Sequence, residues 1–527
     1  MSQIVFRANL AATGFPLTVD LAGRTVVVKQ ADQTHVPTIQ SSKDMDKDTG
    51  IPQLMYCHNV MPTGDGYISV DYNQEASAVL TSVEFFSQIV SLREIAEGTL
   101  GGSYNRIAYL GITLTGHLYY HMAPMTSWTR LPDIAEVTSA AYLTVAHVGG
   151  VSYLYIDGVG CYQFNFSTKN LETVTLNGLD VEDILGIFAS QGYLCAYTAD
   201  AIAWSSTIDV TDFEPSLSTG AGGGKVEQAR GKIIAVESNI TGFIVYTVAN
   251  AVVAVYSGND RYPFNFREIS NSGGIAHPFL VSRGANSGVH FAYTTGGLQQ
   301  VSPVEAKAIF PEVTDFLSSK FMDDFDPTTN TLNRTTLTST AILKQVNLIA
   351  DRYVVISYGA ASFTHALVYD MALERFGKLK ISHMQAFEWF HNKTADFDLA
   401  KTSLGFLTLG GAIVTVNFSH TVGSYVSQTD NQATAILGKY QLVRSRLATL
   451  HAVEVESVRD GDSFSCSILP TLDGKTFLAP IVGTLNNMTS LVKKYWFRYT
   501  GVNHSILLKG RFTLSSLILH MSIHGRR

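Results

Sequence analysis

The sequence predicts an all-β protein, built as a β-propeller of six or seven blades with additional β-rich platform and tip elements and a small helical insertion. Three observations favour this fold class. Similar phrases recur along the chain, each phrase reads as a β-hairpin, and the phrases are spaced at about the length of one blade. A sandwich or two stacked barrels would produce similar hairpins, so these two architectures remain alternatives.

The recurring phrase is clearest in three places. The chain reads GYLCAYTADAIAWS at Gly192–Ser205, GFIVYTVANAVVAVYS at Gly242–Ser257 and GVHFAYTTGGL at Gly288–Leu298. Each time a glycine leads an apolar run, Tyr-Thr precedes a short turn of Ala, Asn, Asp or Gly, and a second apolar run follows. Two apolar runs of strand length joined by such a turn indicate a β-hairpin.

Weaker copies complete the series, at Arg106–Tyr120, Gly149–Tyr162, Tyr353–Tyr369 and Leu404–Val416. About seven hairpins therefore recur roughly every 40–65 residues, and a four-stranded blade needs ~40–50 residues. We interpret each hairpin as the inner half of one blade. A hairpin alone cannot bury both of its faces, whereas blades stacked around an axis can.

Three regions follow from this spacing. Residues 1–100 are expected to form an N-terminal platform segment of mixed strand and helix, with a helix near Val83–Ile95. Residues 101–430 are the propeller body, interrupted by an insertion at 302–350. There Ser302 and Glu305 have the spacing of a capping box, which predicts a helix that begins at Ser302. Residues 431–527 are a C-terminal β-module or the strands that close the propeller.

Composition excludes several classes of function. The net charge is −7 and no basic tail appears, whereas gripping a nucleic-acid backbone needs a face rich in Lys and Arg. Charged residues make up only 15%, which suits a chain that hides much of its surface against neighbours. The uncharged run Ser238–Asn259 is interpreted as a covered hairpin rather than a membrane span, because Thr241-Gly242 and Ala249-Asn250 divide it.

Few motifs point to chemistry. Asp44, Asp46 and Asp48 alternate as in a calcium loop, but the glycine comes one place late and Met55 stands where an EF-hand has Glu, so an acidic solvated turn is the alternative. Gly220–Lys225 lacks the first glycine and the Ser or Thr of a phosphate loop, and is expected to be a flexible surface loop.

In KKYWFRY, the cations Lys493, Lys494 and Arg498 alternate with aromatic residues and are candidates for nucleic-acid contact. The alternative is a strand with Tyr495, Phe497 and Tyr499 inward and the cations outward. No G-x-S-x-G, H-E-x-x-H or carboxylate pair stands out, so we expect neither an enzyme nor a cofactor.

Several phrases together resemble the tail nozzle, or hub, proteins of short-tailed bacteriophages (podoviruses), also known as tubular B-like tail proteins. They cover about residues 55–380 and the last few, at Ala203–Gly231, Pro263–Gly274, Tyr56–Val70, Val368–Leu379 and the closing HGRR. The shared features include Trp-Ser and Asp-Phe before a Gly-rich loop, an Asn-Val-x-Pro phrase followed by Gly-Tyr, and a Tyr-Asp strand that leads into a short turn.

The resemblance implies a structural virion protein of the viral tail, assembled in the host cytoplasm. Members of this family form a homo-hexamer below the portal-adaptor (head-to-tail connector) ring. Their ring continues the channel for genome ejection, passes double-stranded DNA transiently, and carries tail fibre, spike or needle proteins. A negative net charge suits such a channel, because a wall that repels phosphate lets the duplex slide. An acidic lumen is therefore an expectation.

Subunit contacts are expected in loops that leave the repeat body. The candidates are Ser302 and Glu305 with the helix they would begin, and Gly222 and Gly223 in the Gly-rich loop. Two other functions remain as alternatives: a propeller-type phage adhesin that binds host glycan or protein, and a propeller glycosidase. The missing carboxylate pair argues against the glycosidase.

Overall fold

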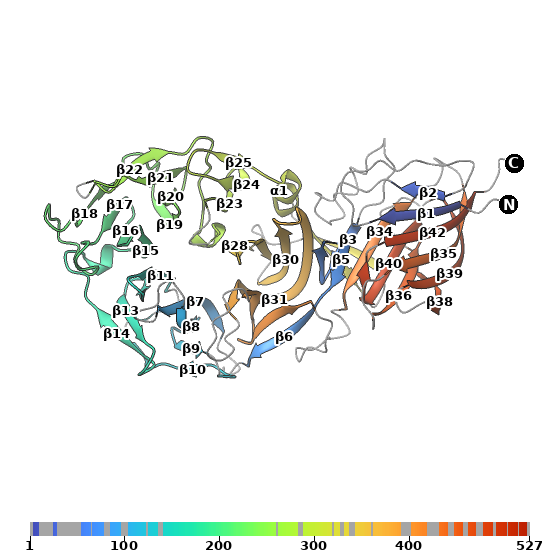
Figure 1. Cartoon of the computed structure of the whole chain (residues 1–527), viewed down its shortest axis with the longest axis horizontal. Helices are drawn as coiled ribbons and strands as arrows, with labels where there is room; N and C mark the ends of the chain where they lie inside the picture. The colour runs from blue at the N-terminus through green and yellow to red at the C-terminus, as the bar shows by residue number, and fades with distance from the viewer. Residues whose placement is uncertain are drawn as a thin grey trace.

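A computed structural model shows a seven-bladed β-propeller joined to a terminal β-sandwich (Figure 1). It describes residues 4–9, 25–28, 54–64, 66–77, 85–95, 104–122, 125–134, 137, 141–259, 262–282, 288–318, 321–326, 331–336, 343–359, 362–390, 402–418, 432–440, 447–456, 462–470, 478–487, 492–502, 504–514 and 516–523. The all-β propeller predicted from the sequence is confirmed, and the blade number is seven.

The first four blades are four-stranded antiparallel sheets formed in chain order. Blade 1 contains β7 (Phe86–Ile95), β8 (Tyr104–Thr113), β9 (Leu118–Met122) and β10 (Thr129–Arg130). Blade 2 contains β11 (Leu143–Val148), β12 (Val151–Ile156), β13 (Gly160–Asn165) and β14 (Asn170–Val174). Blade 3 contains β15 (Gly186–Ser190), β16 (Tyr193–Tyr197), β17 (Ala201–Trp204) and β18 (Gly222–Lys225). Blade 4 contains β19 (Ile233–Asn239), β20 (Gly242–Thr247), β21 (Ala251–Tyr256) and β22 (Phe264–Glu268).

Blade 5 has the same antiparallel strand order as the first four blades, but a single isolated bridge takes the place of its inner strand. Its three strands are β23 (His290–Thr294), β24 (Gly297–Val301) and β25 (Ala306–Ala308). Val281, which follows a 3-10 turn at Pro278–Leu280, bridges Ala292 in the place of the inner strand. Helix α1 (Pro311–Ser318) and a two-stranded hairpin, β26 (Phe321–Asp326) with β27 (Thr331–Thr336), then lead to blade 6.

One long strand serves both of the last two blades. Blade 6 contains β28 (Leu343–Ile349), β29 (Tyr353–Gly359), β30 (Phe363–Asp370) and the first half of β31 (Arg375–Phe390). Past a register shift between His383 and Gln385, β31 becomes the inner strand of blade 7, beside β32 (Thr402–Thr408) and β33 (Ile413–Asn417). The ring is closed by β6 (Asp71–Ala76), which pairs with β33 as the outer strand of blade 7.

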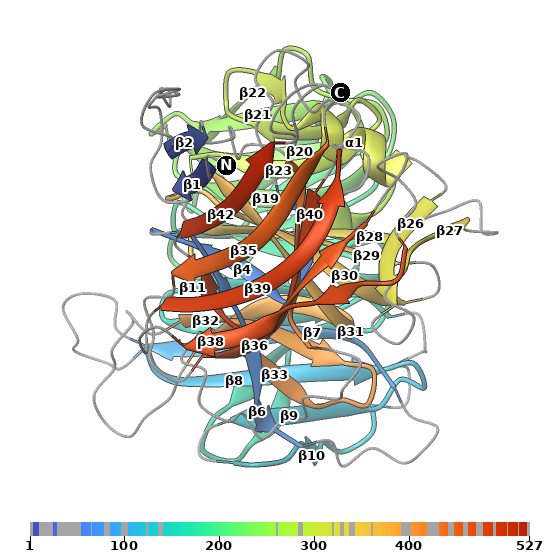
Figure 2. The same cartoon turned by 90° about the vertical axis from the view of Figure 1, so that its right-hand side faces the viewer.

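The terminal sandwich combines both ends of the described chain. One sheet has six strands: β2 (Thr25–Val28), β1 (Ile4–Asn9), β42 (Ser516–Ile523), β35 (Ala448–Glu456), β39 (Val492–Gly501) and β38 (Thr484–Asn487). The other has five: β3 (Leu54–His58), β34 (Thr434–Tyr440), β40 (His504–Arg511), β36 (Ser463–Leu469) and β37 (Ile481–Val482). Figure 2 shows the six-stranded sheet from the end distal to the propeller.

A short bridge of strands joins the sandwich to the propeller. The hairpin of β4 (Val60–Thr63) and β5 (Gly66–Ser69) pairs with β31 on one side and with β41 (Thr513–Leu514) on the other. An ion pair between Arg511 and Asp71, 3.0 Å apart, reinforces the same region. In the described residues, the two units are therefore connected by sheet hydrogen bonding.

The propeller core lies between the blades. Seven separate clusters of buried apolar side chains fill the seven spaces between adjacent blades, and an eighth fills the sandwich. The seven hairpins read from the sequence are the middle strands of the blades, not the inner halves as we expected. A middle strand is covered on both faces, and for this reason β16 and β20 are buried at every position.

One predicted helix is not formed, a second begins later than predicted, and the first blade begins earlier than expected. The segment predicted as a helix near Val83–Ile95 is strand β7, the inner strand of blade 1, and neighbouring blades bury its Phe86 and Leu92. The expected boundary at residue 100 therefore falls within blade 1, and β6, also expected in the platform, closes the propeller. The helix predicted to begin at Ser302 begins instead at Pro311, after β25.

Side chains bond neighbouring inner strands to one another around the ring. The Gln88 amide donates to and accepts from the backbone of Leu143 (2.7 and 2.8 Å), which links blade 1 to blade 2. Thr144 Oγ1 accepts from the Ile187 N–H (2.8 Å), which links blade 2 to blade 3. Each contact satisfies buried backbone groups that no strand in the same blade reaches.

The recurring Tyr-Thr phrase is explained by the turn after the second strand. The threonine hydroxyl accepts a hydrogen bond from a backbone N–H on the far side of the turn in five blades, at Thr113, Thr198, Thr247, Thr294 and Thr408. Ser and Thr hydroxyls stabilise turns in this way. The repeat in the sequence is thus a repeat of turn geometry.

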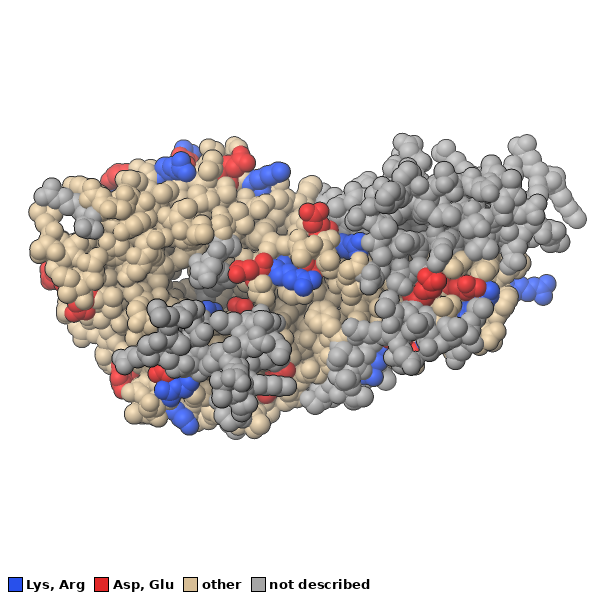
Figure 3. Space-filling model, in the orientation of Figure 1, with Lys and Arg blue, Asp and Glu red and all other residues tan. Residues whose placement is uncertain are grey.

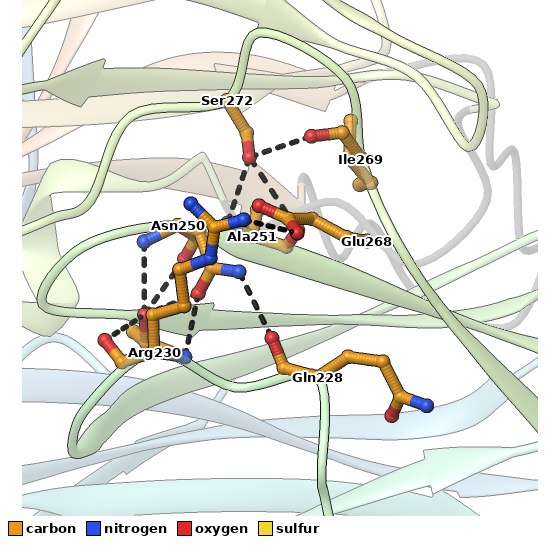
Figure 4. Close-up of polar contacts among 8 residues, drawn as sticks. Gln228, Arg230, Asn250, Ala251, Glu268, Ile269 and Ser272 are labelled. Atoms are coloured by element: carbon orange, nitrogen blue, oxygen red, sulfur yellow. Dashed lines mark hydrogen bonds and ion pairs between the residues drawn. The ribbon is translucent and has the colours of Figure 1, made fainter.

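In blade 4 the turn is joined to two further loops (Figure 4). Asn250 Oδ1 accepts from the Arg230 N–H, and Asn250 Nδ2 donates to the Gln228 carbonyl, both at 3.0 Å. Arg230 also pairs with Glu268 at 2.8 Å. Asn250 is buried, so these bonds satisfy an amide that would otherwise be costly to bury.

Candidate functional site: the terminal sandwich and its open edge

Ser302 and Glu305, predicted to start a helix for subunit contact, lie in the exposed turn between β24 and β25. Ser302 Oγ accepts from the N–H groups of Val304 and Glu305, at 3.3 and 3.1 Å. Ser302 therefore bonds to following N–H groups as a capping residue does, but it closes a turn, so the predicted helix start at Ser302 is wrong. Val304 at the tip of this turn is 66% exposed.

Gly222 and Gly223, predicted in a flexible loop, belong to β18, the outer strand of blade 3. Gly222 lies against the ring of Trp204, whose indole N–H donates to the Gly220 carbonyl at 3.1 Å. A Cβ at Gly223 would come within 2.8 Å of the Ile202 carbonyl oxygen. The glycines are thus explained by close packing of the outer strand on β17.

The three cations predicted for nucleic-acid contact do not act as a group. Lys493 Nζ donates to the Asp462 carbonyl and lies 5.0 Å from the centre of the Phe464 ring. Lys494 is 13% exposed and pairs with Glu454, whereas Arg498 is exposed. The alternation predicted for this strand is seen in Tyr495, which is buried in the core, and in Phe497 and Tyr499, which pack against it.

A polar triad lies on the outer face of the six-stranded sheet. Glu454 accepts from Lys494 Nζ at 2.5 Å and contacts His520 Nε2 at 2.7 Å. Burial raises the pKa of Glu454, but the hydrogen bond from Lys494 and the neighbouring His520 outweigh it and hold the pKa below its usual range. Burial lowers the pKa of His520. The positive charge of Lys494 is therefore balanced by Glu454 within the fold, which leaves little of it to bind a phosphate group.

The open edge of the sandwich carries apolar side chains. The segment Ile481–Asn487 forms the outermost strand of both sheets, first β37 and then β38. Val482 is 68% exposed, and Leu485 and Trp496 are each 45% exposed. We call Ile481–Asn487 together with Trp496 the sandwich edge. Sequence reasoning missed it, although its lack of charged residues over seven positions was a signal.

No metal centre is found in the described part of the chain. No group of three or more His, Cys, Asp or Glu side chains there is arranged to hold an ion, and Asp44, Asp46 and Asp48 lie outside the described residues. The four cysteines are buried and free, and burial raises the pKa of Cys57 and Cys161 to about 12. These thiols have the properties of core residues rather than of nucleophiles.

The charged side chains are sparse on the face shown in Figure 3. Described Lys, Arg, Asp and Glu residues are scattered there and form no continuous basic area. Among the described residues, no helix is long and apolar enough to cross a membrane. Within the described residues, the arrangement presents packing surfaces and strand edges.

Comparisons with known proteins find structural similarity only, at low sequence identity. No family model and no curated protein matches the chain. Among solved structures, the chain is similar to the WD40 beta propeller domain of Doa1 (TM-score 0.38, 7% identity, 67% of this chain and 99% of that chain). It is also similar to YCF48 from Cyanidioschyzon merolae (TM-score 0.37, 14% identity, 66% and 99%) and to YCF48 bound to D1 peptide (TM-score 0.35, 10% identity, 66% and 96%).

Proposed function

We propose that this chain is a structural protein of a short-tailed phage virion, the subunit of a hexameric tail nozzle below the portal-adaptor ring. The observation that carries the proposal is a propeller joined by sheet hydrogen bonding to a sandwich whose described outer strands, β37 and β38, carry no charged residue. Such a molecule is suited to be a building block, because exposed apolar edges in a soluble protein mark association sites.

The nozzle proposal also agrees with the distribution of charge. Lys493 and Lys494 are engaged within the fold, and the chain as a whole is acidic. A wall of this kind would let DNA pass without holding it, since retention requires many phosphate contacts from free cations. The passage would run between the copies of the ring, and fibre, spike or needle proteins would attach around it.

Imaging of single particles tests the proposal directly. The purified protein is imaged alone and after mixing with a portal-adaptor ring. The adaptor is the one from a short-tailed phage whose gene lies beside the gene of this chain. Six-fold rings with an open centre, in either sample, are the expected result. Isolated propellers that never join the adaptor would contradict the nozzle proposal.

The second candidate is a phage adhesin, and an aromatic cluster between blades 3 and 4 favours it. Trp204 and Tyr256 are partly exposed and lie 5.8 and 6.0 Å from the Phe264 ring. Exposed aromatic faces bind sugar rings and peptide side chains. Screening against host-surface glycans separates the candidates, because a nozzle subunit should give no saturable binding that Trp204→Ala abolishes.

A further inference from the structure

In the described chain, the two strands at the sandwich edge each have a neighbouring strand on one side only. In the sheet orders of the described residues, β38 is the last strand of the six-stranded sheet and β37 the last of the five-stranded sheet. No strand of the described chain pairs with the outer side of either one. Edge strands in soluble proteins are usually protected by charges, prolines or covering elements.

Within the described residues, the sandwich edge shows no such protection. Its sequence, IVGTLNN, contains no charged residue and no proline. Val482 and Leu485 expose apolar side chains from the two edge strands, and Trp496 lies beside Thr484 in the adjacent strand. An exposed apolar edge of this kind is expected to be covered by another strand in the working state of the protein.

Among the described residues, the β26–β27 hairpin also lacks a third strand, so it could supply a strand to the sandwich edge. Its six-residue strands pair with each other from Phe321↔Thr336 to Asp326↔Thr331, and no third strand of the described chain joins them. A two-stranded hairpin is marginally stable in water and needs further strands or a packed face. The hairpin stands away from β38 of the same molecule (Figure 2), so pairing between the two would require a second molecule.

We propose that the β26–β27 hairpin of one copy adds to the sandwich edge of a second copy by pairing β27 with β38. β27 is the suitable strand because its sequence, TLNRTT, carries one charge, whereas FMDDFD of β26 carries three aspartates that would blunt its edge. The pairing joins two different surfaces, so it is head-to-tail and can close a ring. This inference rests on the proposed function and identifies the contact that builds the ring.

Complementation between two variants tests the pairing. The edge variant carries Val482→Lys and Leu485→Lys, at exposed positions where the fold tolerates a charge. The hairpin variant replaces residues 321–336 with a Gly-Ser linker. Each variant alone has one intact surface and is expected to remain monomeric by light scattering. Mixed together, the edge variant supplies the hairpin and the hairpin variant supplies the edge, so two-chain complexes are expected.

The same mixture has an optical readout. Trp496 is the most exposed tryptophan, while Trp128 and Trp389 are buried, so docking on the sandwich edge should protect Trp496 from acrylamide quenching. A matched control is Ile240→Lys, an exposed apolar residue of blade 4 that lies outside both surfaces. This variant is expected to assemble as the wild type does.

The outcomes separate the inference from the proposed function. Variants that fail to bind each other in the mixture would overturn the pairing, and wild-type rings seen by imaging in that case would leave the nozzle proposal standing. A hairpin variant that still self-associates through its edges would also overturn it, because that result indicates symmetric edge-to-edge contact.

Discussion

The side-chain amide of Gln385 forms two hydrogen bonds with the backbone of Ile89, accepting from its N–H at 2.8 Å and donating to its carbonyl at 3.0 Å. These two residues lie on the inner strands of blades 7 and 1, so the contact spans the point where the ring closes. The Gln385 side chain thus forms the two hydrogen bonds that a neighbouring strand would form with Ile89, although the two inner strands do not pair directly.

Loss of this contact should weaken the closed ring. Gln385→Ala removes the amide and leaves a buried N–H and carbonyl unpaired, which should lower the free energy of unfolding by about 2–4 kcal/mol. Chemical denaturation followed by tryptophan fluorescence measures the change. The control is Gln163→Ala on β13, a half-buried glutamine that should cost less than about 0.5 kcal/mol. Equal effects of the two substitutions would refute the role of Gln385.

The threonine turns should contribute to stability individually. Thr247→Val keeps the shape of the side chain but removes the hydroxyl that accepts from the N–H groups of Ala249 and Asn250. We expect a loss of about 1–2 kcal/mol, because Thr247 and Asn250 are buried and the Asn250 N–H would lose its partner away from water. Thr173→Val, on the exposed strand β14, is the matched control and should be nearly neutral. A neutral Thr247→Val would show that the turn does not need the hydroxyl.

Burial in blade 4 raises the pKa of Glu237 to about 8, above its usual 4.5. Between these values the unfolded chain loses its proton while the folded chain keeps it, so the stability falls as the pH rises, by at most about 1.4 kcal/mol per unit. Glu237→Gln should remove this dependence, and its advantage over the wild type should grow from pH 5 to pH 8. Thermal unfolding across that range measures it, and parallel curves for the two proteins would contradict the assignment.

The two cationic candidates on β39 should behave differently. Lys494→Met leaves Glu454 partly buried beside His520 without its ion pair, and should destabilise the sandwich by about 2–4 kcal/mol. Arg498→Ala should leave stability unchanged. If the strand serves as packing, neither substitution alters retention of duplex DNA on a low-salt column. A salt-dependent loss of DNA binding in Arg498→Ala would restore the nucleic-acid hypothesis.

The sequence predicted the repeat but not the place of the repeat within each blade. The phrase around Thr247 carries its own turn chemistry and its own apolar runs, so a hairpin there is readable locally. Whether that hairpin forms the two inner strands or the two middle strands of a blade depends on which further strands pair with it. Gly222 illustrates the limit, because the glycines of β18 satisfy contacts with β17 that only the folded sheet creates.

Helix and strand were confused where the apolar spacing fits a helix. In β7 the apolar residues Phe86, Ile89 and Val90 have the i, i+3, i+4 spacing of a helix, and tertiary packing decides in favour of the strand. The sandwich edge was missed for a related reason. Leu485 and Val482 look like ordinary strand residues in sequence, and only the order of strands shows that they lie at an edge. The subunit-contact and virion roles remain predictions.

The closure of the ring by β6 sets a schedule for synthesis. Between Ala76 at the end of β6 and Asn417 at the end of β33 the ribosome must add about 340 residues. At translation rates of about 5–20 residues per second, β6 waits roughly 20–70 s for its partner. During that interval neither the last blade nor the sandwich can be completed, because β1 and β3 also await strands made after residue 430. A ribosome that stalls late in the message would therefore release an open arc of blades, and quality control of the nascent chain should act most strongly on this protein at that stage.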